Sequence, residues 1–159
     1  MANVRDGSPP PSEADVTAVE RRLGVGLPPD YRAFLLAHDG GEPDPAWFLE
    51  PPTLPAAAAD WVESFAGCGE LASDAEYYRR ALGLPPEFLP VGTLGGGGGT
   101  LLLRVAGPRR GGVVGWWAKD TGYPGGAVGE LAETWADFLT SLRDEAVVRG
   151  EMHRRRGHA

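Results

Sequence analysis

The stretch Ser12–Gly41, SEADVTAVERRLGVGLPPDYRAFLLAHDGG, contains two successive helix signals. Ser12 is a good N-cap, and apolar residues then recur at helical spacing until Gly24 gives a stop signal, which predicts a helix over 13–23. A second helix begins at Leu27 and its two prolines, which the first turn tolerates, and ends at the glycine pair 40–41. The short connection predicts a helical hairpin that buries Val19, Leu23, Tyr31, Phe34 and Leu35.

The rest of the chain predicts helices, then a meander of strands, then a long C-terminal helix. We expect strands at 47–49, 88–93, 100–106 and 113–118, and helices at 56–65, 73–82 and 130–148. The run Gly95–Gly99 reads as a hairpin connection and 120–129 as a loop. This order indicates an α+β fold in one domain over 12–148. Three consecutive prolines make 1–11 a disordered lead, and 149–159 is expected to be a basic flexible tail.

Composition favours an acidic domain with a protein partner. The 159 residues carry a net charge of −7, and the tail from Arg149 contributes +3, which leaves −10 for the remainder. Between Asp39 and Glu87 stand ten acidic residues and two arginines. Such a surface repels phosphate backbones, so we expect no direct nucleic-acid binding by the core, and a basic partner instead. No apolar run is long enough to span a membrane, and no secretory signal is visible, so we expect a cytoplasmic protein.

Motifs for catalysis and metal binding are weak throughout the sequence. The glycine run lacks the lysine of a phosphate-binding loop and opens a strand instead of a helix. His38 stands alone and is expected at a helix end, and Cys68 has no second cysteine for a metal site. A Cys68–His38 pair stays open as an alternative. We therefore expect no enzyme activity, no catalytic residue, no metal and no cofactor.

Trp116 and Trp117 are neighbours on a predicted strand, so their indoles should point to opposite faces. One is then a core residue, and the other is either exposed at a contact surface or covered by the loop 120–129. An exposed tryptophan near acidic residues has the composition of a binding hot spot.

Several motifs together resemble the Smi1/Knr4 (SUKH) superfamily. They are Glu20-Arg21-Arg22-Leu23-Gly24 followed by Leu27-Pro28-Pro29-Asp30-Tyr31, then Phe34-Leu35, then His38-Asp39-Gly40-Gly41, Leu89-Pro90-Val91-Gly92 and the closing Leu131 to Leu139 segment with Trp135 and Phe138. The resemblance covers about residues 12–143. It departs from the family pattern at Thr100, where an acidic residue is common, and at the Ala-rich segment 56–69, which looks like an insertion.

The resemblance implies an α+β domain with a twisted, mainly antiparallel sheet and helices packed around it. It also implies function by protein binding. Many bacterial members are immunity proteins that neutralise toxins, often nucleases or deaminases, and fungal relatives are regulatory scaffolds. We therefore expect an immunity protein that masks the active site of a cognate toxin; a regulatory module that binds a housekeeping protein is the alternative. The candidate contact residues are Asp39, Glu42, Asp44, Trp47, Glu70, Asp74, Glu76 and one of Trp116 and Trp117, whereas Tyr31, Phe34, Trp135 and Phe138 are expected in the core.

Overall fold

The computed structural model describes residues 3–5, 8–51, 58–95, 98–117, 122–123 and 128–158. The predicted hairpin consists of α1 (Glu13–Leu23) and α2 (Pro29–Ala37). Helix α2 ends earlier than predicted, because its C-cap is the extended His38 and not the glycine pair 40–41. Ser12 and Asp15 form a reciprocal capping box at the start of α1, and Gly24 ends it with φ of 73°. Among the hairpin residues expected inside, Tyr31, Phe34 and Leu35 are buried, and Val19 and Leu23 are partly buried.

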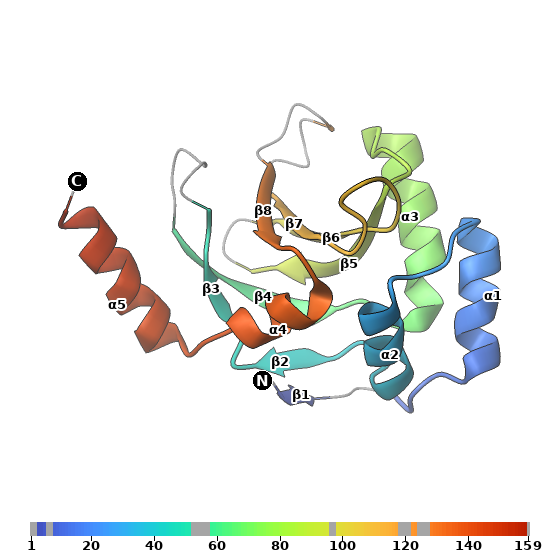
Figure 1. The fold of residues 1–159 in the computed structure, drawn as a ribbon, viewed down its shortest axis with the longest axis horizontal. Helices are drawn as coiled ribbons and strands as arrows, with labels where there is room; N and C mark the ends of the chain where they lie inside the picture. Colours follow the sequence, from blue (N-terminus) through green and yellow to red (C-terminus); the bar gives the residue numbers. More distant parts are fainter. Residues whose placement is uncertain are drawn as a thin grey trace.

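A curled six-stranded sheet forms the centre of the molecule (Figure 1). Each strand pairs antiparallel with its neighbour in chain order, which confirms the predicted α+β fold. The strands are β3 (Trp47–Leu49), β4 (Ala59–Phe65), β5 (Phe88–Leu94), β6 (Thr100–Arg104), β7 (Val113–Trp116) and β8 (Val128–Ala132). The Leu94 N–H at the end of β5 donates a hydrogen bond to the Gly99 carbonyl oxygen just before β6, as a hairpin connection requires. Residues 96–97 and most of the predicted loop 120–129 lie outside the described residues.

A second, two-stranded sheet pairs β1 (Asn3–Arg5) with β2 (Glu42–Asp44). The structure here differs from the disordered lead expected for residues 1–11, because Pro9–Pro11 follow the strand and do not interrupt it. Gly41 makes the close approach possible: a Cβ there would lie 2.5 Å from the Arg5 carbonyl oxygen, and its φ is 108°. Gly41, three residues after the C-cap of α2, therefore positions the N-terminal strand.

The helix predicted over 56–65 is wrong, because residues 59–65 form strand β4. Residues 56–57 lie outside the described part of the chain. Burial alternates along β4, with Asp60, Val62 and Phe65 directed inward. Pairing to β3 on one side and β5 on the other overrides the helix preference of the alanines.

The long helix predicted over 130–148 is also wrong. Residues 128–132 form β8, followed by α4 (Trp135–Ser141) and α5 (Glu145–Arg156). Thr134 starts α4 as its N-cap, accepting a hydrogen bond from the Asp137 N–H, and Leu142 is extended. Helix α5 extends through most of the expected tail, anchored by the buried Val148 and Met152. In Figure 1 it lies at the opposite end of the molecule from α1 and α3.

The sheet has two faces that carry different apolar clusters. The inner face packs against the helical hairpin and α4, with Trp135 in edge-on contact with Tyr31, Phe34 and Phe65. The outer face is partly covered by α3 (Cys68–Leu82), whose Tyr78 and Leu82 contact a smaller cluster around Trp116. This confirms the core assignment of Tyr31, Phe34, Trp135 and Phe138, all of which are buried.

Candidate protein-binding site

A row of hydroxyl side chains crosses the outer face of the sheet. Ser64 of β4 is paired with Thr93 of β5, Thr93 with Thr100 of β6, and Thr100 with Trp116 of β7. The Ser64 and Thr93 hydroxyls lie 3.1 Å apart, and the Thr100 hydroxyl is 3.2 Å from the Tyr78 hydroxyl of α3. The strand register therefore forms a polar floor. It is exposed at Thr93 and ends at Thr100 beneath α3.

Helix α3 supplies one wall of a recess above this floor. Glu70, Asp74 and Tyr78 follow one another at four-residue spacing, which places them on one side of the helix. The recess has a volume of about 80 Å³. Its lining consists of Ser64, Phe65, Ala66, Glu70, Asp74, Tyr78, Pro90, Gly92, Thr93 and Thr100.

The two carboxylates of this recess stand without a cationic partner. Among the described residues, neither Glu70 nor Asp74 has an arginine within ion-pair distance, whereas Glu76 on the same helix forms two hydrogen bonds to Arg22. Partial burial and the neighbouring Glu70 carboxylate raise the pKa of Asp74. Both causes penalise the ionised form, so a cation at this position would be favoured.

An aromatic pair lies on the same outer face. The rings of Trp47 and Trp61, on the paired strands β3 and β4, are 4.7 Å apart, and both residues are partly exposed. The Arg149 guanidinium of α5 lies 5.0 Å from the centre of the Trp47 ring. The strand register shifts between Val62 and Ser64, and the Trp61 ring lies against Gly95, two residues after Thr93. The indoles and the hydroxyl row therefore belong to one face.

The remaining predicted contact residues have structural partners or lie elsewhere. The Asp39 carboxylate accepts the Cys68 N–H at the start of α3, and Glu42 forms an exposed ion pair with Arg5 across β1 and β2. Asp44 is exposed on β2. Trp116 is fully buried, and the partly buried Trp117 donates its indole N–H to Asp60 on the inner side. Of the predicted set, Glu70 and Asp74 thus border the recess, and Trp47 shares its face.

Sequence reasoning missed Ser64, Tyr78, Thr93, Thr100 and Trp61. All but Tyr78 lie on strands, where register brings together residues such as Ser64, Thr93 and Thr100, which are 7 to 29 positions apart. No local motif reports this register. The i, i+4 spacing of Glu70, Asp74 and Tyr78 was a readable signal, because it places all three on one side of a helix.

Cys68 and His38 do not form a catalytic pair in this arrangement. The His38 ring packs against Phe34 with ring centres 5.0 Å apart. Cys68 borders a separate hollow of about 360 Å³ with Asp15, Asp39 and Pro9–Pro11, and His38 is not part of that lining. Burial, assisted by the nearby Asp39 and Asp15 carboxylates, raises the pKa of the Cys68 thiol, which is the opposite of what a nucleophilic thiolate requires.

The described part of the chain shows neither a clustered set of metal ligands nor a long apolar helix. No group of three or more His, Cys, Asp or Glu side chains there is arranged to hold a metal ion. None of the helices there has the length and apolar character that crossing a membrane requires.

The architecture is that of an α+β domain in which a helical hairpin precedes an antiparallel meander, with an open polar recess on the outer face of its sheet. The profile of the SMI1 / KNR4 family (SUKH-1) matches residues 10–141, and the chain belongs to this family. This confirms the resemblance found in the sequence motifs and is consistent with a protein-binding role. The matched region ends at the last residue of α4, so α5 lies beyond it. No curated protein matches the chain significantly.

Proposed function

We propose that this protein is an immunity protein that binds a cognate bacterial toxin in the cytoplasm and masks its active site or substrate path. The observation that carries the proposal is the recess in which Glu70 and Asp74 have no arginine partner among the described residues and lie beside an open hydroxyl floor. Membership of a protein-binding family supports it. The partner is basic, as a nuclease or deaminase that holds phosphate groups would be.

The proposed contact surface is the outer face from the recess to the aromatic pair. Glu70 and Asp74 supply charge, while Trp47 and Trp61 supply large apolar area of the kind that dominates binding energy in interfaces. Asp44 remains a proposed contact at the margin, because it is exposed on β2. Asp39, Glu42, Glu76, Trp116 and Trp117 are left out, because each is engaged within the fold or buried.

Co-expression with the product of the adjacent upstream gene tests the proposal. We expect that product to stop growth of a host when expressed alone, and the full-length chain to restore growth. The double variant Glu70→Lys/Asp74→Lys should fail to restore growth. The matched control Glu133→Lys/Asp137→Lys, which has the same charge change at exposed positions before and in α4, should succeed.

Two results would refute the toxin assignment: a neighbouring gene product that is not toxic, or one that stays fully toxic in the presence of the wild-type chain. Affinity purification of the tagged chain then decides the alternative. Recovery of a stoichiometric housekeeping protein, lost in the Glu70→Lys/Asp74→Lys variant, would favour a regulatory module that uses the same surface.

A further inference from the structure

We propose that the outer-face recess receives a single arginine side chain presented by the protein partner, an inference that rests on the proposed binding function and names its anchor. Three features of the molecule support it: the size of the recess, its acceptor atoms, and the pairing of the chain's arginines with other acids.

The size of the recess suits a side-chain head group. Its volume of about 80 Å³ corresponds to a few water molecules at about 30 Å³ each. Pockets for small organic ligands are larger, about 300–1,000 Å³. The recess is also open on one side, where the exposed Thr93 borders it, so a side chain from another protein can enter without opening the fold.

The lining offers acceptors in more than one direction. The Glu70 and Asp74 carboxylates lie on the α3 wall, the Ser64 and Thr93 hydroxyls on the floor, and the Tyr78 ring at the inner end. Thr100 is only 1% exposed, and its contact with the Tyr78 hydroxyl fixes that end of the floor. A guanidinium carries five N–H donors in a planar fork and stacks on aromatic rings, whereas a lysine ammonium is a compact point charge. The lining therefore favours arginine.

Several described arginines are paired with acids elsewhere, and none of them lies within ion-pair distance of Glu70 or Asp74. Arg22 is paired with Glu76, and Arg79 donates to the carbonyl of Pro86 at the other end of α3. Arg32 is paired with Glu13 and Glu20, and Arg104 with Glu87 and Glu130. Other acids without an arginine partner among the described residues, such as Glu133 and Asp137, are exposed, whereas Asp74 is partly buried above the polar floor. We infer that the cation for Glu70 and Asp74 comes from outside.

Chemical-shift mapping on the full-length protein tests the inference without the unknown partner. The probe is acetyl-Gly-Arg-Gly-amide, compared with its citrulline counterpart, which keeps the planar shape and lacks the charge. We expect the arginine peptide to shift backbone amide signals of residues 64–66, 70–78 and 92–93, and the citrulline peptide to leave them in place. The lysine counterpart should bind more weakly than arginine.

Variants locate the site and separate binding from folding. Glu70→Gln/Asp74→Asn should weaken arginine-peptide binding about tenfold, and Thr93→Val should weaken it less, as expected for lost charge-assisted and neutral hydrogen bonds. The control Glu133→Gln/Asp137→Asn should bind as the wild type does. Dispersed spectra of each variant show that it is folded; if the double recess variant unfolds, Asp74→Asn alone takes its place.

Three outcomes would overturn the inference: no shifts at saturating peptide, equal shifts with citrulline, or shifts that the recess variants leave unchanged. The result is independent of the growth experiment. If the recess binds arginine but the chain does not protect against the toxin, the toxin assignment is wrong and the recess proposal stands. If the chain protects but the recess does not bind arginine, the toxin assignment stands and the recess proposal is wrong.

Discussion

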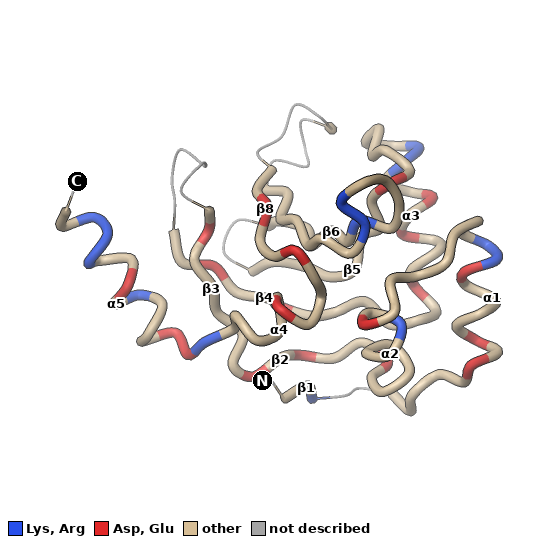
Figure 2. Tube along the Cα trace, in the orientation of Figure 1, with Lys and Arg blue, Asp and Glu red and all other residues tan. Residues whose placement is uncertain are grey.

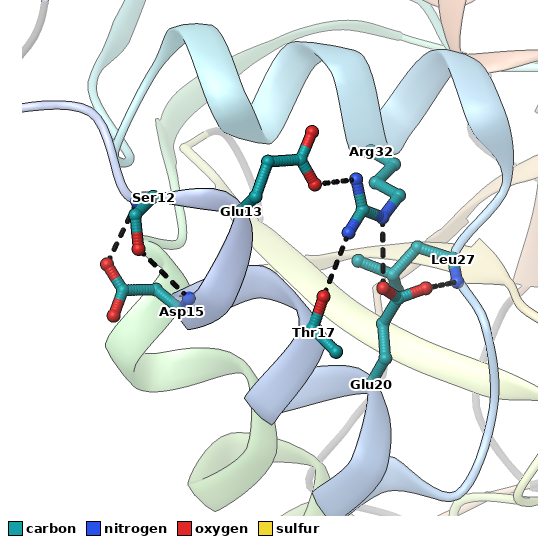
Figure 3. Close-up of polar contacts among 7 residues, drawn as sticks. All are labelled: Ser12, Glu13, Asp15, Thr17, Glu20, Leu27 and Arg32. Atoms are coloured by element: carbon teal, nitrogen blue, oxygen red, sulfur yellow. Dashed lines mark hydrogen bonds and ion pairs between the residues drawn. The ribbon is translucent and has the colours of Figure 1, made fainter.

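Glu20 shows what a sequence motif residue does at the scale of single side chains (Figure 3). Its carboxylate accepts the Leu27 N–H at 2.8 Å and the Arg32 Nε–H at 2.9 Å. Arg32 also donates to Glu13 and to the Thr17 hydroxyl. One partly buried carboxylate thus ties α1 to the turn before α2 and to α2 itself. This explains why a glutamate precedes the Leu23-Gly24 stop in the motif that suggested the family.

Replacing Glu20 should destabilise the hairpin in a pH-dependent way. Although burial opposes it, the hydrogen bonds from Leu27 and Arg32 lower the pKa of Glu20. A lowered pKa in the folded state stabilises the fold above the unfolded-state pKa of about 4.3, and this stabilisation is lost as the pH falls through the folded value. Chemical unfolding of Glu20→Gln should show a loss of about 1–2 kcal/mol at pH 7.

The wild-type advantage over Glu20→Gln should shrink below a pH of about 4. Glu133→Gln is the control, because Glu133 is exposed and forms no ion pair among the described residues. A difference between wild type and Glu20→Gln that stays constant from pH 7 to pH 3 would contradict this role of the carboxylate.

At the scale of elements, a residue distant in the chain supplies the helix cap that α3 itself lacks. The N-cap of α3 is Gly67, which has no side chain to accept a backbone N–H. Asp39, from the loop after α2, accepts the Cys68 N–H at 2.8 Å in its place. The motif His38-Asp39-Gly40-Gly41 therefore joins α2, α3 and the small sheet. Its aspartate, a predicted contact residue, has a structural role.

Substituting Asp39 should weaken α3 without changing the recess. Removing a capping carboxylate costs about 1 kcal/mol, so Asp39→Ala should unfold at lower denaturant, and Asp39→Asn, which keeps an acceptor oxygen, should lose less. Hydrogen exchange should quicken first at amides 68–71. If Asp39→Ala keeps its stability but loses partner binding, Asp39 is a contact residue and its capping role is refuted.

The elements that sequence reasoning placed correctly are those with local signals. Ser12 and Gly24 mark both ends of α1, and the glycine run separates β5 from β6. Strand β4 was missed because the alanine run 56–59 that leads into it favours helix, and only pairing with β3 and β5 decides otherwise. The same limit applied to the site: Glu70, Asp74 and Trp47 were found by composition, whereas the hydroxyl floor depends on register between strands.

At the scale of the whole molecule, charge is distributed more evenly than the sequence suggested. Figure 2 shows acidic residues on most elements, and arginines on α5, on the turn between β6 and β7, and near the ends of α1 and α3. Many acids are paired internally, including the Arg104–Glu130 contact. The net charge of −7 can still attract a basic partner over a distance of about 8–10 Å, the range that physiological salt allows. Attraction at long range and the lifetime of the complex should then depend on different residues.

Binding kinetics with the purified cognate partner should separate these two contributions. Glu70→Lys/Asp74→Lys and Glu133→Lys/Asp137→Lys each change the net charge by the same amount, from −7 to −3. If the whole-molecule field steers association, both variants should slow the association rate constant by similar factors, and added salt should reduce the wild-type rate. Dissociation should quicken tenfold or more in the recess variant alone, because loss of a desolvated charge pair acts on the dissociation rate. Equal dissociation rates in the two variants would show that the recess is no closer to the partner than the acidic residues near α4.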